Sequence, residues 1–200
     1  MPARSRYSLA EIQGHALALV DRDGLAGLTM RALAARLGTG PMTIYNYVRD
    51  REALEELVVA AVTESIVLPP QTGDWAADVR AIARAAWSAI RAHPAAVPLV
   101  LTRRASRPTA YGPAEALVAA LARGGLEGHD LLAAFRTVLG YVMGAAQAEY
   151  ASPLDAERIG DHAATDHPHL AALAQVSQRS DPETDFDAGL TILLRGLSPP

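Results

Sequence analysis

The chain has 200 residues, a net charge of −4 and no cysteine. The absence of cysteine excludes disulfides, thiolate metal sites and cysteine nucleophiles. No apolar run approaches the roughly 20 residues that span a membrane, and the N-terminus lacks the apolar segment of a signal peptide. We therefore expect a cytoplasmic protein without a membrane partner, with enough residues for one large domain or two small ones.

The charges are distributed unevenly along the chain. Residues 1–51 contain seven arginines and four acidic residues, which give a net charge of +3. Residues 52–200 contain eleven arginines and eighteen acidic residues, which give −7. The overall negative charge argues against a protein that coats nucleic acid with its whole surface. A basic N-terminal quarter is typical of DNA binding at one end of the molecule.

The first predicted helix begins after Ser8 and closes near Gly24. Ser8 and Glu11 have the spacing of a capping box, in which each side chain accepts the backbone N–H of the other residue. Arg4 and Arg6 precede this helix. They form either a basic arm that lies along DNA phosphates or a solvated tail.

Two short predicted helices follow, joined by a turn that contains glycine. Thr29 can cap the second helix, on which Leu33 and Leu37 share one face. Gly38 can take the left-handed conformation that ends it, and Pro41 suits the first position of the third helix. This arrangement is typical of a helix-turn-helix, which places its second helix in the major groove. The alternative is a pair of short helices joined by a glycine turn that does not bind DNA.

The third helix has one apolar side and one side with hydrogen-bonding groups. A rotation of about 100° per residue turns Ile44 and Val48 toward the second helix. The opposite side presents Met42, Thr43, Asn46 and Tyr47. The paired donor and acceptor of Asn46 suit an adenine edge, and Met42 suits a thymine methyl.

Asp50 caps a fourth predicted helix over residues 51–68, which has an apolar stripe and acidic residues near its N-terminus. A pair of prolines ends this helix. We therefore expect a DNA-binding domain over residues 1–50 and a second, larger domain over residues 51–200, connected by helix 51–68. Since every strongly patterned segment is helical, the predicted fold class is all-α.

The next predicted helix begins at Asp74 and carries Val79, Ile82 and Ile90 inward, flanked by tryptophans. His93 and the proline after it end this helix. Four prolines break the following segment, which predicts a short helix and a loop there. A helix over residues 113–123 precedes a glycine-rich turn.

The helix predicted from Leu131 to Tyr150 is apolar on two sides. One stripe has large side chains, and the other has Ala133, Gly140 and Gly144, so we expect this helix to be buried all round. The last helix has a further apolar stripe. These two helices and their copies in a second subunit would form a four-helix bundle, although both stripes could also fill the core of one chain. The predicted dimer interface consists of Phe135, Val138, Val142, Phe186, Leu190, Leu193 and Leu197.

Several acidic residues and histidines gather between these two helices: Asp161, His162, Asp166, His167 and His169. Histidine and aspartate are ligands of zinc and similar ions. Because no regular pair on an established helix supports a site, we favour a polar loop and expect neither a metal nor a cofactor.

Two segments of the N-terminal quarter carry a family resemblance. They read Leu-Thr-Met-Arg-Ala-Leu-Ala-Ala-Arg-Leu-Gly at residues 28–38 and Ile-Tyr-Asn-Tyr-Val-Arg-Asp-Arg-Glu-Ala-Leu at residues 44–54. This part of the chain resembles the DNA-binding domain of the TetR family of bacterial transcriptional repressors. Residues 167–170 and 186–197 are similar to the C-terminal domain of the tetracycline-repressor type.

The resemblance implies an all-helical homodimer that binds double-stranded operator DNA of palindromic sequence, with one DNA-binding domain on each half-site. It also implies a pocket for a small-molecule effector in residues 51–200, and occupation of this pocket moves helix 51–68. Thr29 and Tyr45 would then hold phosphates, and Arg51 would contact the DNA backbone. The bases would be read by Arg31, Met42, Thr43, Asn46 and Tyr47.

The implied effector pocket is expected to be mainly apolar with a few polar groups. The candidates, each of which could instead be ordinary core packing, are Trp87, Leu99, Arg104, Leu117, Phe135, Met143, Gln147 and Glu149. Tetracycline-binding members use a histidine in the middle of this domain, where the chain reads Val97-Pro98-Leu99. This difference argues against tetracycline as the effector.

The resulting hypothesis is a ligand-responsive transcriptional repressor. A dimeric small-molecule carrier and a transcriptional activator are the alternatives. We do not expect an enzyme, because the chain has no Gly-x-Ser-x-Gly elbow and no His-Glu-x-x-His motif.

Overall fold

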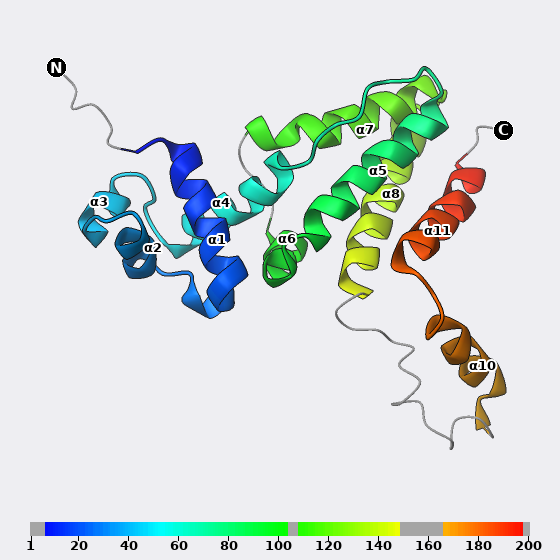
Figure 1. Cartoon of the computed structure of the whole chain (residues 1–200). Helices are drawn as coiled ribbons and strands as arrows, with labels where there is room; N and C mark the ends of the chain where they lie inside the picture. The colour runs from blue at the N-terminus through cyan, green and yellow to red at the C-terminus, as the bar shows by residue number, and fades with distance from the viewer. Residues whose placement is uncertain (1–6, 104–107, 149–165, 198–200) are drawn as a thin grey trace.

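The structure, a computed structural model, describes residues 7–103, 108–148 and 166–197. All regular elements in these ranges are helices, and no strand occurs in them. The prediction of an all-α fold is therefore confirmed. Figure 1 shows a small group of helices at one end, a larger group at the other, and α4 between them.

The small group, which we call the head, consists of α1 (Leu9–Gly27), α2 (Met30–Arg36) and α3 (Pro41–Tyr45). The predicted capping box is present: Glu11 N donates to Ser8 Oγ over 3.1 Å, and Ser8 N donates to the Glu11 carboxylate over 2.6 Å. Gly24 has φ 69° and interrupts the helical geometry of α1 near the predicted end. The head core contains Ile12, Leu19, Val20, Leu28, Leu33, Ile44 and Val48.

Helix α4 (Arg51–Glu64) begins where the sequence predicts, because Asp50 Oδ1 accepts the N–H of Ala53 over 2.8 Å. It ends four residues before the predicted position at Leu68. Proline disfavours helical geometry in the residue before it, and Pro69 follows Leu68. Val67 is 83% exposed, so little burial favours an extra turn.

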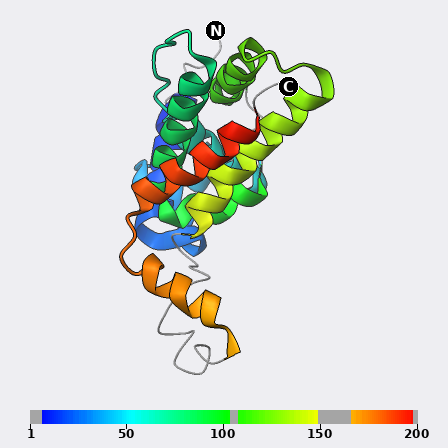
Figure 2. The same ribbon diagram turned by 90° about the vertical axis from the view of Figure 1, so that its right-hand side faces the viewer.

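The larger group, which we call the body, surrounds α5 (Trp75–Arg91). Helix α5 lies beside α7 and α8, and α11 runs along α8 on the outer side (Figures 1 and 2). The remaining body elements are η1 (Pro94–Ala96), α6 (Val97–Thr102), η2 (Pro108–Tyr111), α7 (Gly112–Arg123), α8 (Gly128–Ala148), α10 (Pro168–Ser177) and α11 (Pro182–Gly196).

The head and the body share one continuous cluster of buried apolar residues. At the contact between α1 and α4, the buried Gln13 donates to Glu64 Oε2 over 2.7 Å. The division into domains at residue 50 therefore stays a prediction, because no break in the core marks it.

Helix α8 is long and apolar enough to cross a membrane by length and composition. The expectation that no apolar run approaches that length is therefore wrong for this helix. Four of its residues, Ala134, Val138, Val142 and Ala146, are buried in the body.

Helix α10 lies away from the rest of the body in both views (Figures 1 and 2). Its Leu170, Leu173 and Val176 are 42%, 52% and 64% exposed. Such a row of exposed apolar side chains is unusual for a helix in a single soluble chain.

Candidate DNA-binding head and ligand pocket

The turn between α2 and α3 has the geometry that the sequence predicts. Thr29 Oγ1 accepts the N–H of Ala32 over 3.1 Å. Gly38 has φ 63°, in the left-handed region. The N–H of Thr39 reaches back to the carbonyl of Ala34 over 2.9 Å, which closes α2 as a Schellman motif. Pro41 then opens α3.

The side chains of α3 and of the residues just after it form a buried group and a more exposed group. Ile44 and Val48 are buried, as predicted, with exposed fractions of 0% and 2%. Met42 is 75% and Tyr45 48% exposed. Asn46 is exposed and Thr43 is half-buried. This outward surface, consisting of Met42, Thr43, Tyr45 and Asn46, is what the head can present to a DNA groove.

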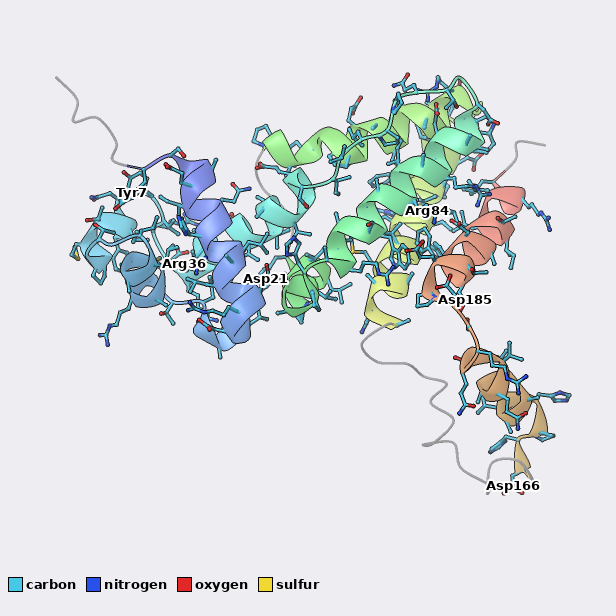
Figure 3. All side chains as sticks on the ribbon, in the orientation of Figure 1. Tyr7, Asp21, Arg36, Arg84, Asp166 and Asp185 are labelled. Atoms are coloured by element: carbon cyan, nitrogen blue, oxygen red, sulfur yellow. The ribbon has the colours of Figure 1, made fainter. Side chains whose placement is uncertain are left out.

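Tyr47 lies against the start of α1, and its prediction as a base-reading residue stays untested. It is half-buried, and its phenol oxygen accepts the N–H of Tyr7 over 3.2 Å. The two rings meet edge to face at 6.4 Å between centroids. Tyr7, labelled in Figure 3, also donates from its hydroxyl to the carbonyl of Leu37 over 2.7 Å. Tyr47 therefore holds the end of α3 against the start of α1.

Arg51 and Arg31 occupy different surroundings. Arg31 is exposed on α2. The guanidinium of Arg51 donates to the carbonyls of Leu28 and Leu25, both over 3.1 Å, and to Glu55 over 2.9 Å. Because a guanidinium has five N–H groups, Arg51 keeps two donors for a phosphate while it fixes α4 to the end of α1.

A cavity of about 740 Å³ lies in the body. Helices α4, α5, α6, α7 and α8 and the turn η2 contribute to its wall. The lining residues are Val59, Val62, Thr63, Ile66, Ile82, Ala83, Ala86, Ile90, Val100, Leu101, Thr102, Arg103, Ala110, Tyr111, Pro113, Ala114, Leu117, Leu132, Phe135, Arg136, Leu139, Val142 and Met143.

Three of the eight predicted pocket residues, namely Leu117, Phe135 and Met143, line this cavity. Leu99 is buried elsewhere in the core, and Gln147 is exposed outside the lining. Arg104 and Glu149 lie outside the described residues.

Trp87 is absent from the lining and packs against α11 instead. Its ring stacks on Phe186 of α11 at 4.4 Å between centroids with an interplanar angle of 8°. The guanidinium of Arg91 lies 4.4 Å from the centroid of the Trp87 ring. The prediction of Trp87 as a pocket residue is therefore corrected.

The contribution of α4 to the cavity was not predicted from the sequence. Val59, Val62 and Thr63 line it from the C-terminal half of that helix, and Ile66 lines it just after the helix ends. The apolar stripe on helix 51–68 could have indicated this contribution, because a helix that connects the head and the body has to bury its stripe against one of them.

Arg103, directly after α6, joins the cavity wall to the start of α4. Its Nη1 lies 2.5 Å from Glu52 Oε1, and its Nη2 lies 3.1 Å from Glu55 Oε2. The Glu55 side chain is only 13% exposed. Because Glu55 also accepts from Arg51, the cavity, α4 and the end of α1 are connected by consecutive hydrogen bonds.

Most of the predicted dimer residues lie inside the single chain. Val138, Val142, Phe186 and Leu190 are buried, with exposed fractions of 0%, 3%, 2% and 0%. Phe135 lines the cavity. The four buried residues pack within their own chain, and the place of these five residues in a dimer interface stays a prediction.

Leu193 and Leu197, the other two predicted interface residues, are half-buried against the core. On α8, the small-residue stripe contains Ala133, Gly140 and Gly144, which are exposed in the chain. The expectation that α8 is buried all round is therefore wrong for the isolated chain.

Within the described ranges, no three histidine, aspartate or glutamate side chains lie together as a set of metal ligands. His167 and His169 are exposed near the start of α10. Asp161 and His162 lie outside the described residues, and metal binding there stays an untested alternative.

The family model described as "Tetracyclin repressor-like, C-terminal domain" matches residues 69–199, which is more than half of the chain. The chain belongs to the TetR family. The repressor DrrR1 of Streptomyces coeruleorubidus is 34% identical over 136 residues, which make up 67% of this chain and 50% of DrrR1. This TetR-family chain thus spans about half the length of that relative.

Two other proteins match the TetR-family chain over nearly its whole length. The class A tetracycline repressor from transposon 1721 of Escherichia coli is 29% identical over 190 residues, or 92% of this chain and 87% of that repressor. The crystal structure of apo ActR from Streptomyces coelicolor has a TM-score of 0.83 and 27% identity, covering 98% of this chain and 96% of ActR.

Proposed function

We propose that this TetR-family chain is a transcriptional repressor that binds operator DNA as a homodimer and is released by a small-molecule effector. One structural observation carries the proposal: α4 begins at the end of the helix-turn-helix and forms part of the cavity wall. A molecule that enters the cavity therefore contacts the helix that positions the head.

The proposed DNA contacts lie on the outward surface of the head. Bases are read by Met42, Thr43 and Asn46, and by Arg31 from α2. Phosphates are held by Thr29, Tyr45 and Arg51, which retain hydrogen-bonding groups for this purpose. The exposure of Met42, Tyr45 and Asn46 supports these roles.

The proposed dimer contact uses the outer faces of α8 and α11. A Cβ atom added at Gly140 or Gly144 would have no heavy atom within 4 Å, so this face of α8 is open in the single chain. Ile192 on α11 is 71% exposed. Two such helices from each subunit would form a four-helix bundle and would place two heads at one fixed separation.

The proposed effector site is the body cavity. Its volume, about 740 Å³, is within the range of small-molecule sites. ActR from Streptomyces coelicolor, which has this fold, has also been crystallised in complex with actinorhodin. An effector that prefers the DNA-incompetent dimer by about 3 kcal/mol would lower operator affinity by about two powers of ten.

Selection of bound fragments from random or genomic DNA tests the proposal and supplies an operator. Fluorescence anisotropy at matched salt then measures its affinity for the wild type, for Asn46→Ala and for the exposed control Gln178→Ala. We expect Asn46→Ala to lose operator affinity by a factor of at least about ten, since a good base contact is worth about 1 to 3 kcal/mol. The operator affinity of the control should change little. The absence of any saturable, salt-dependent binding by the wild type would refute the proposal.

A further inference from the structure

The lining of the body cavity has an unusual charge composition. Among the described residues that form it, the charged side chains are Arg103 and Arg136, and there is no aspartate, glutamate, histidine, asparagine or glutamine. The remaining residues are mostly aliphatic or aromatic. The wall therefore offers positive charge and apolar surface.

The hydroxyl groups of the lining threonines already have acceptors for their protons. Thr63 Oγ1 donates to the carbonyl of Val59 over 2.9 Å, and Thr102 Oγ1 donates to the carbonyl of Pro98 over 2.7 Å. Besides the phenol of Tyr111, the side-chain donors left to a ligand in the described lining are therefore those of the two arginines.

The two arginines differ in what already surrounds them. The positive charge of Arg103 is compensated by Glu52 and Glu55, at 2.5 and 3.1 Å. An anion at Arg103 would have to displace these carboxylates or approach them against repulsion. Arg103 is therefore a poor first contact for an anion.

Among the described residues of the cavity wall, Arg136 is the arginine without a carboxylate partner. In the described part of the chain it forms no ion pair, and it lies on the exposed side of α8. Leu132 and Leu139, one turn before and after it, line the same cavity and are 42% and 39% exposed. Arg136 thus stands among apolar side chains at the mouth of the cavity.

We propose that the cavity selects a mainly apolar ligand with an anionic group, such as a carboxylate, a sulfonate or a phenolate, and that Arg136 binds this group. The inference rests on the proposed function, in which this cavity is the effector site. A planar guanidinium donates two parallel hydrogen bonds to a carboxylate or a sulfonate and a single charge-assisted bond to a phenolate, and an apolar surrounding strengthens the attraction. A ligand cation would face two arginines and no carboxylate among the described lining residues.

Two fluorescent probes with the same aromatic framework test the inference in the absence of DNA. Anilinonaphthalene sulfonate is an anion, and phenylnaphthylamine is its uncharged counterpart. Titration at physiological salt measures both dissociation constants for the wild type and for Arg136→Met. We expect the sulfonate to bind at least about fivefold more tightly than the amine, as a partly exposed charge-assisted pair allows. Arg136→Met should remove most of this difference and leave the affinity for the amine within about twofold.

Three further variants locate the effect. Arg49→Met removes an arginine of the head whose side chain is 80% exposed, and should change neither affinity. Arg136→Lys keeps the charge without the planar fork and should bind the sulfonate with intermediate affinity. Leu139→Trp fills the mouth of the cavity and should weaken both probes. Circular dichroism establishes that each variant is folded.

Equal affinity of the wild type for the two probes would overturn the inference. Three further results would also overturn it. They are an equal loss of affinity for both probes in Arg136→Met, a loss of charge selectivity in Arg49→Met as large as that in Arg136→Met, and unchanged affinity for both probes in Leu139→Trp. Operator affinity is measured separately on the same variants. If operator binding persists while charge selectivity is absent, the ligand class is wrong and the proposed repressor function stands.

Discussion

Asp21 of α1 and His93, just after α5, join the head to the body. His93 Nδ1 lies 2.9 Å from Asp21 Oδ2 and 3.1 Å from Asp21 Oδ1. Figure 3 shows Asp21 on the side of α1 that faces the body. This contact does not involve α4, so the head is attached to the body at a second point besides the connecting helix.

The variant Asp21→Asn should loosen this second attachment with little effect on overall stability. Both side chains are partly exposed, 36% for Asp21 and 22% for His93, so we expect the free energy of unfolding to fall by less than about 1 kcal/mol. Hydrogen exchange should become faster in residues 19–24 and unchanged in the core of the head. Asp23→Asn is the matched control, because in the described part of the chain Asp23 pairs with Arg22 of the same helix and forms no ion pair with the body. Equal exchange in the two variants would contradict the role of Asp21.

The variant Arg103→Met should release the start of α4 from the cavity wall. It removes the hydrogen bonds to Glu52 and Glu55, of which Glu55 is largely buried. We expect faster hydrogen exchange over residues 51–57, since local opening of a segment becomes easier when its tertiary contacts are lost. Arg84→Met is the control, because Arg84 contacts two carboxylates of α11 and none of α4. Unchanged exchange over residues 51–57 would show that Arg103 does not hold α4.

Asp78 should make the stability of the body sensitive to acid. This buried residue of α5 accepts hydrogen bonds from the N–H and the hydroxyl of Thr72, both over 2.8 Å, and from Arg123 over 2.6 Å. The bonds from Thr72, followed by the bond and charge of Arg123, lower the pKa of Asp78 below its usual value. A carboxylate with a lowered pKa stabilises the fold above the unfolded-state pKa of about 4, and this contribution is lost as the pH falls through the lowered pKa.

Urea denaturation at a series of pH values checks this prediction. The wild type should lose stability as the pH falls below about 4. Asp78→Asn should be less stable than the wild type at neutral pH and should lose less on acidification. Glu127→Gln, at an exposed position without an ion pair in the described residues, serves as the control. Identical slopes for Asp78→Asn and the wild type would exclude Asp78 as a source of the acid sensitivity.

Local signals in the sequence were sufficient to predict where several helices begin and end. Ser8, Thr29, Asp50 and Gly38 act within one turn of their own position, so their roles depend on few distant contacts. The inward turn of Tyr47 could not be predicted in the same way. It depends on Tyr7, 40 residues earlier in the chain.

The faces of the body helices were harder to assign. Periodicity shows that Phe186, Leu190 and Val142 are buried, but it does not show whether the covering helix belongs to the same chain or to another. Trp87 illustrates the same limit: its side of α5 is set by stacking on Phe186, about 100 residues later. The cavity therefore had to be located from the packing of the helices.

The turn of the helix-turn-helix should depend on glycine at residue 38. Gly38 has φ 63°, and a Cβ atom added there would meet no heavy atom within 4 Å. The effect of Gly38→Ala is therefore conformational and not steric: we expect a loss of about 1 to 2 kcal/mol in the free energy of unfolding. Gly14→Ala is the matched control. Gly14 lies within α1 with equally open surroundings and an ordinary backbone, so alanine should stabilise the chain by about 0.5 to 1 kcal/mol. Chemical denaturation measures both values, and changes of the same sign in the two variants would contradict the assignment of the turn.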